Sequence, residues 1–151
     1  MKDNSEMKGR FKIENITTGE VRETPNTIVS LGKSMMAGLV AADINVGSAF
    51  DWIALGIGSS TITANDILLG SEYIKYGLGS VTGTRTTTTV TNDTATFIGS
   101  FGIDATKIIN EAGLFNQSGL DTGSMMARTT FTDISAGSGD KLNTTWNITF
   151  S

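Results

Sequence analysis

Leu142-Asn143-Thr144-Thr145-Trp146-Asn147-Ile148-Thr149-Phe150 carries the clearest two-residue repeat of the chain. Large apolar side chains and one threonine occupy one set of alternate positions, and asparagine and threonine occupy the other. Successive side chains of a β-strand point to opposite faces of its sheet, so this alternation predicts a half-buried strand. We therefore expect Trp146, Ile148 and Phe150 to point into the core.

Further strands are predicted on the N-terminal side of this stretch. Residues 10–16 alternate polar and apolar side chains, residues 50–57 form a dense apolar run, and residues 125–134 precede the last strand across a Gly-rich turn. The segments 86–90 and 94–101 indicate a hairpin, because turn-forming residues separate them. Apolar residues of these and neighbouring segments complete the predicted core: Trp52, Leu55, Leu114, Phe115 and Phe131.

One amphipathic helix is predicted, over about residues 26–42. Pro25 is expected to end the strand before it, and Asn26 offers an N-cap. Apolar side chains then follow at helical spacing. The stretch from Thr63 to Asp66 resembles a capping box, which predicts one more short turn of helix after it.

Several short strands, Gly-rich turns and a single helix predict a mainly β fold, an antiparallel β-sandwich or jelly-roll-like domain. The length of 151 residues fits one domain. Residues 1–8 are polar apart from Met1 and Met7. We expect them to form an N-terminal arm beside a single domain at residues 9–151.

The composition argues against several classes of function. The chain has no histidine and no cysteine, which removes Ser–His triads, thiolate nucleophiles and the commonest metal ligands. A net charge of −4 without a basic stripe argues against nucleic-acid binding. The longest apolar stretch, near residues 35–42, is too short to span a membrane. We expect no enzymatic activity, no cofactor, no metal site and no membrane association.

Three polar or glycine-containing features have mainly structural interpretations. Glu111 and Arg128 are candidates for an internal ion pair between neighbouring strands, with a solvated, intersubunit or catalytic role as alternatives. Gly56-x-Gly58 lacks the third glycine of a dinucleotide-binding motif and the lysine of a P-loop. Its glycines are expected to serve a turn with positive φ or close packing. The run Thr86–Thr89 predicts an exposed strand, or a sheet edge that pairs with another chain.

Several blocks follow one another in a recurrent order between residues 26 and 150: Asp51-Trp52-Ile53-Ala54-Leu55-Gly56-Ile57-Gly58-Ser59-Ser60, Leu69-Gly70-Ser71-Glu72, Asn110-Glu111-Ala112-Gly113-Leu114-Phe115-Asn116, Met125-Met126-Ala127-Arg128-Thr129-Thr130-Phe131 and the final strand. In this order they resemble structural proteins of tailed bacterial and archaeal viruses. Where that pattern often places an Arg after the Leu…Glu step, this chain has Tyr73-Ile74-Lys75. The resemblance implies a virion component of the tail, a fibre or the capsid surface.

Composition and resemblance together predict a non-enzymatic virion protein, made in the host cytoplasm, that acts by self-association. The family implies a homo-oligomer, a trimer by analogy, in contact with other virion proteins such as the major capsid or tail proteins. The candidate assembly residues are Met1, Met7, Thr86 and Thr88. A receptor- or glycan-binding module at a fibre tip is the alternative. An enzyme using a carboxylate pair or Ser–Lys chemistry is a third possibility, without a constellation that stands out.

Overall fold

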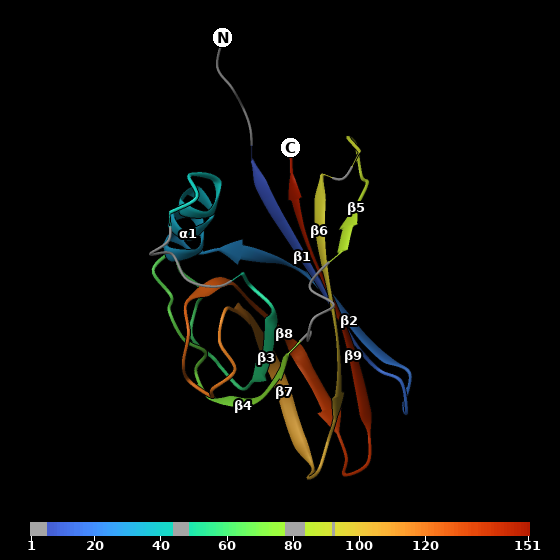
Figure 1. Ribbon diagram of the computed structural model, residues 1–151. Helices are drawn as coiled ribbons and strands as arrows, with labels where there is room; N and C mark the ends of the chain where they lie inside the picture. Colours follow the sequence, from blue (N-terminus) through green and yellow to red (C-terminus); the bar gives the residue numbers. More distant parts are fainter. Residues whose placement is uncertain (1–5, 44–48, 78–83, 92) are drawn as a thin grey trace.

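The computed structural model describes residues 6–43, 49–77, 84–91 and 93–151 (Figure 1). Within these residues, nine strands and one helix follow one another along the chain. Their bounds are β1 (Met7–Asn15), β2 (Glu20–Ile28), α1 (Ser30–Val40), β3 (Trp52–Gly56), β4 (Glu72–Gly77), β5 (Thr84–Thr86), β6 (Thr94–Gly102), β7 (Lys107–Phe115), β8 (Met125–Ala136) and β9 (Lys141–Phe150).

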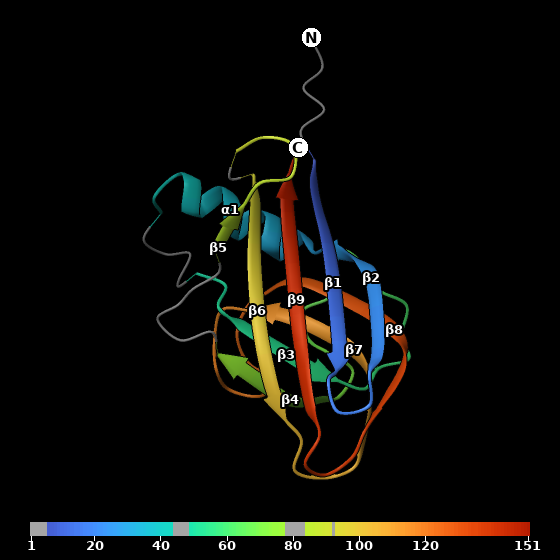
Figure 2. The same cartoon turned by 90° about the vertical axis from the view of Figure 1, so that its right-hand side faces the viewer.

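The strands form one curled antiparallel sheet with the order β4-β3-β7-β8-β2-β1-β9-β6-β5. Strand β2 connects the two halves of the sheet, β4-β3-β7-β8 and β1-β9-β6-β5. Its residues 20–26 pair with β1, and only Thr27 and Ile28 pair with β8. Figure 2 shows β6, β9, β1 and β2 side by side, with β3, β4 and β7 behind them. The mainly antiparallel β composition is confirmed, whereas the separate sheets of a sandwich or jelly roll are not, since one continuous sheet curls around the core.

The last strand lies at the centre of the core. Trp146 and Ile148 are fully buried, and the Trp146 ring packs against Phe11 with 4.8 Å between ring centroids. Trp146 Nε1 also donates a hydrogen bond to Asn26 Oδ1 at 3.0 Å. This single side chain therefore joins β9 to β1 by packing and to β2 by a hydrogen bond.

The other predicted core residues divide into three groups. Leu55, Leu114 and Phe115 are fully buried, whereas Trp52 and Phe131 are partly buried and pack on the edges of the core clusters. Phe150 corrects the prediction, because its side chain is 40% exposed. It follows the inward alternation of β9 but lies at the last position of the strand, where it lines an open hollow.

The helix is shorter than predicted, since α1 covers Ser30–Val40. Pro25 does not end β2 and Asn26 is not an N-cap: Pro25 lies opposite Arg10 and Asn26 lies opposite Gly9 in β1. The hydrogen bond to Trp146 therefore holds Asn26 in an extended chain, and tertiary contacts override the local helix signal.

Helix α1 lies against the beginning of β8. A Cβ atom on Gly32 would come within 2.4 Å of the Met126 carbonyl oxygen, so only glycine permits this approach. The last residues of the helix, Leu39 and Val40, are exposed. Among the described residues, no helix has the length and apolar character needed to cross a membrane.

The predicted assembly residues have different positions. Met1 lies outside the described residues, whereas Met7 begins β1 opposite Phe150, so the sheet already includes the end of the predicted arm. Thr86 is exposed on β5, and Thr88 lies in the following loop.

The strand predicted at residues 86–90 ends at Thr86. The chain turns after β5 because the Asp93 carboxylate accepts hydrogen bonds from the backbone N–H groups of Val90, Thr89 and Thr88. These donors lower the pKa of Asp93 far below its usual range. A strong carboxylate acceptor thus replaces the predicted second half of the strand with a tight loop.

We expect Trp146→Ala to lower the free energy of unfolding by about 3–5 kcal/mol, because the cavity left by the indole cannot be refilled. Chemical denaturation measures this value. Thr145→Ala, on the other face of β9, is the matched control and should change stability by about 0.5 kcal/mol or less. Equal effects of the two substitutions would contradict the burial of Trp146.

Candidate functional site

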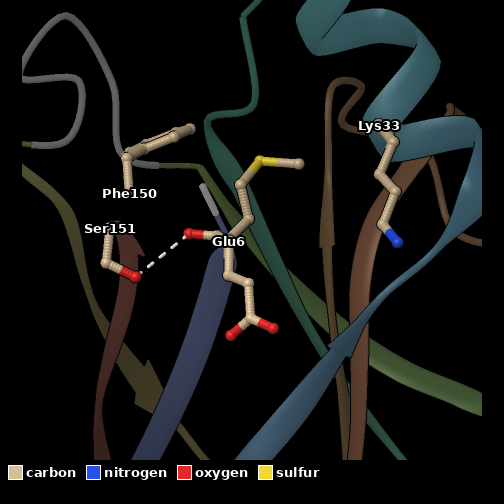
Figure 3. A pocket seen from close by; sticks show the side chains of 5 residues that line it. Glu6, Lys33, Phe150 and Ser151 are labelled. Atoms are coloured by element: carbon tan, nitrogen blue, oxygen red, sulfur yellow. Dashed lines mark hydrogen bonds between the residues drawn. The ribbon is translucent and has the colours of Figure 1, made fainter. Parts of the chain in front are cut away.

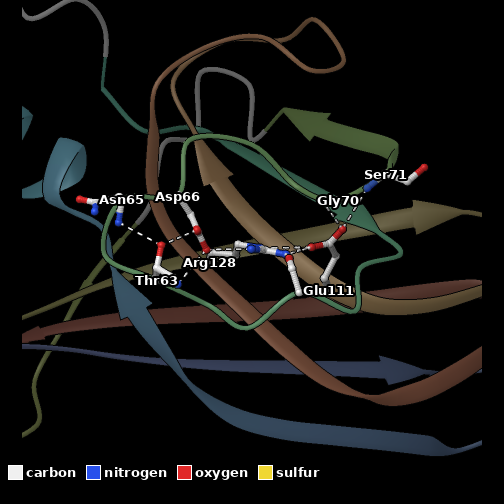
Figure 4. A network of polar contacts seen from close by, with 8 residues as sticks. Thr63, Asn65, Asp66, Gly70, Ser71, Glu111 and Arg128 are labelled. Carbon is white, nitrogen blue, oxygen red and sulfur yellow. Dashed lines mark hydrogen bonds and ion pairs between the residues drawn. The ribbon is translucent and has the colours of Figure 1, made fainter.

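A buried network of charged groups lies between β7, β8 and the loop at residues 57–71 (Figure 4). Arg128 of β8 donates from Nη2 (2.8 Å) and Nε (3.2 Å) to Glu111 Oε2 on β7. Its Nη1 donates to Asp66 Oδ2 at 2.7 Å, and Nη2 also donates to Ser60 Oγ at 2.9 Å. The Arg128 and Glu111 side chains are 3% and 0% exposed. The structure thus brings together the predicted pair and adds a second acid.

The second oxygen of Glu111 binds the backbone of the same loop. Oε1 accepts hydrogen bonds from the N–H groups of Gly70 (2.7 Å) and Ser71 (3.2 Å). A Cβ atom on Gly58 would lie 2.4 Å from Glu111 Oε2, and one on Gly70 would lie 3.2 Å from Oε1. Neither Gly56 nor Gly58 has a positive φ. The Gly56-x-Gly58 pattern therefore serves close packing around a carboxylate.

Hydrogen bonds favour the charged forms of Asp66 and Arg128. Burial disfavours the charged form of Asp66, but hydrogen bonds from Thr63 and Arg128 outweigh it and lower the Asp66 pKa. Burial likewise opposes the charge on Arg128, while hydrogen bonds to Asp66 and Glu111 raise its pKa. Both oxygens of Glu111 accept hydrogen bonds from N–H donors within the network.

The mechanical effect of the network is to hold a long loop in place. No helix forms after Asp66, although its carboxylate accepts hydrogen bonds from the N–H and hydroxyl of Thr63 as in a capping box; the same carboxylate also accepts from Arg128. The loop presents Ile67 and Leu68, which are 59% and 40% exposed, directly after this anchor. Costly buried charges thus fix a loop that carries exposed apolar side chains.

A second buried ion pair, which the sequence reasoning missed, lies on β4. Lys75 Nζ is 3.2 Å from Glu72 Oε1, and both side chains are almost completely buried. The ammonium lies 4.2 Å from the centre of the Phe115 ring. Burial raises the pKa of Glu72, and the positive charge of Lys75 opposes the rise. Residues three apart in a regular strand point to opposite faces, so the sequence offered no signal for this pair; a register shift in the pairing of β3 with β4 brings the two charges to the same side.

Lys75 also holds a tight turn of the β7–β8 loop. Its Nζ donates to the carbonyl oxygens of Gly119 (2.7 Å) and Thr122 (3.1 Å). Thr122 N and Oγ1 both donate to Gly119 O, which closes the turn. Leu120 is 52% exposed at the corner, and the exposed Asp121 has φ +52°, a conformation that aspartate tolerates better than most residues. We call residues 119–122 the acidic turn.

A hollow of about 690 Å³ lies between α1 and the ends of β1 and β9; Glu6, Met7, Lys33, Phe150 and Ser151 line it. Figure 3 shows Lys33 reaching from the helix on one side, with Phe150, Ser151 and Glu6 on the other. Glu6 forms an ion pair with Lys8 at 3.1 Å. Within the described part of the chain, no acidic side chain is paired with Lys33.

The described residues contain no group of three or more acidic side chains arranged to hold a metal ion. No known protein family, curated protein or solved structure matches this chain.

Glu111→Ala should lower the free energy of unfolding by about 3–5 kcal/mol, because it breaks a buried pair. Gly58→Ala should also destabilise the protein, since its new methyl group meets the Glu111 carboxylate. In the Glu111→Ala background, however, Gly58→Ala should cost markedly less. Chemical denaturation of the four proteins measures this coupling, and strictly additive effects would show that the glycine does not make room for the carboxylate.

Acid should weaken the anchor of the loop. Because the folded-state pKa of Asp66 lies below its ordinary value of 3.8, its stabilising contribution is present above that pH and is lost as the pH falls further. The unfolding free energy of Asp66→Asn should therefore fall less steeply between about pH 4 and pH 2 than that of the wild type. Parallel curves for the two proteins would contradict a lowered pKa.

Proposed function

We propose that this protein is a non-enzymatic virion component that works by self-association and by docking onto a virus particle, as a capsid decoration or as part of a tail or fibre. The observation that carries the proposal is the use of two buried ion pairs to fix two exposed loops. Arg128 anchors the loop that presents Ile67 and Leu68, and Lys75 anchors the acidic turn.

Rigid, partly apolar loops suit protein–protein contacts better than catalysis. Burying a charge costs free energy that the ion pair alone rarely returns, so stability is a weak reason for these networks. Loops that are already ordered lose little conformational entropy when a partner binds. A structural protein gains assembly-ready surfaces from this arrangement.

The viral part of the proposal rests on the resemblance of the sequence blocks, and their positions support it. The block with Gly58, the block with Gly70, the block with Glu111 and the block with Arg128 all contribute to one network. Segments far apart in the sequence therefore act as one structural unit. This meeting of the blocks in one network supports a structural role for the pattern that they form.

The ends of the sheet offer further contact surfaces. Strands β4 and β5 are the two edge strands of the sheet, and each pairs with only one neighbouring strand among the described residues. An edge strand presents backbone groups that a strand of another chain can bind. Thr86 lies on β5 at such an edge, which supports it as an assembly residue.

Receptor or glycan binding remains the second candidate, because a groove of about 560 Å³ crosses one end of the sheet. Hydroxyl and cationic groups of Arg10, Thr88, Thr89 and Thr149 line part of it. Such groups suit sugar hydroxyls. The two tryptophans that would stack on sugar rings are, however, buried or half-buried in the sheet.

Sedimentation equilibrium tests the proposed self-association. We expect an oligomer of the 15.9 kDa chain, with a trimer as the leading stoichiometry, and peptides of the chain in purified virus particles. Arg128→Ala should impair assembly by releasing the loop at residues 57–71, while Lys12→Ala, on the exposed part of β1, should not. A monomer at several hundred micromolar, together with absence from particles, would refute the proposal.

A further inference from the structure

We propose that the acidic turn of one copy docks into the hollow beside Lys33 of a second copy. This inference rests on the proposed self-association and names the surfaces that carry it. The proposed contact places Leu120 against Met7 and Phe150, and Asp121 beside Lys33.

The acidic turn has the properties of a docking element. Leu120 and Asp121 occupy its two corners and are both exposed. The buried Lys75 ammonium holds the carbonyl groups on either side of them, and the left-handed conformation of Asp121 sets the direction of the corner. The turn therefore presents one apolar and one acidic side chain in a fixed geometry before any partner binds.

The hollow offers the complementary groups. Met7 and Phe150 supply apolar surface, and Phe150 remains 40% exposed although its position in β9 points inward. Lys33 supplies a positive charge with no acidic partner among the described residues. Glu6, the acid at the rim, is already paired with Lys8. A ligand with an apolar side chain next to a carboxylate matches this arrangement.

A volume of about 690 Å³ accommodates the tip of a turn. Turn and hollow are different surfaces of one chain, so two copies either exchange the contact reciprocally in a twofold dimer or repeat it head to tail in a closed ring or an open filament. A ring of three copies would satisfy every turn and every hollow. The same contact in an unclosed geometry would produce fibres.

A double-mutant cycle with the full chain tests the charge contact. Asp121→Asn keeps a residue that tolerates the left-handed backbone, and it should weaken self-association about tenfold by removing the negative charge. Lys33→Glu should weaken it further, because two acids then face each other. In the Lys33→Glu background, Asp121→Asn should instead strengthen association. This reversal of sign is expected only if the two side chains meet, and additive effects would overturn the proposal.

Cysteine cross-linking tests the geometry, because the natural chain contains no cysteine. A mixture of Leu120→Cys and Phe150→Cys proteins should form a mixed disulfide dimer under mild oxidation. Ile98→Cys, at an exposed site on β6, mixed with Phe150→Cys is the matched control and should not. Thermal unfolding of each variant checks that it folds.

The outcomes separate this inference from the proposed function. A wild-type oligomer with no cross-link above the Ile98 control would overturn the turn-and-hollow contact and leave self-association intact. A wild-type monomer would overturn both.

Discussion

The ion pair between Glu111 and Arg128 determines how the chain around it is arranged. A carboxylate buried beside two β-strands needs donors on both oxygens, and here Arg128 satisfies one oxygen while the backbone of Gly70 and Ser71 satisfies the other. The loop must therefore pass close to Glu111, which requires a glycine at position 58. The glycines, the course of the loop and the exposure of its apolar tip follow from satisfying one buried charge.

The site around Lys75 on β4 is a second case in which a buried charge binds the backbone of a loop. A lysine enclosed by apolar surface binds carbonyl groups of a loop and holds a turn that would otherwise be free. In both sites two opposite charges come from the sheet, and further partners of these charges come from a loop. The buried charges of the sheet thus fix the loops by hydrogen bonds, and these loops carry the surfaces that we propose for assembly.

The curl of the sheet has a different origin. Strand β2 leaves β1 and joins β8 within a few residues, and the hydrogen bond from Trp146 to Asn26 lies at this transition. The core closes around Trp146 but not at the end of β9, where Phe150 and Met7 face the hollow. An incompletely covered core end next to α1 is a natural place for another chain to bind.

The sequence by itself determined the mainly β character and the burial of Trp146 and Ile148, because strand alternation is a local signal, and it offered Glu111 and Arg128 as a candidate pair. Only the tertiary structure decided that Asn26 belongs to a strand, that Asp66 and Lys75 anchor loops, and that Phe150 stays partly exposed. These outcomes depend on which distant segments meet. A helix cap and an inward strand position each have a favourable local form, and contacts with residues far along the chain replace that form when they are stronger.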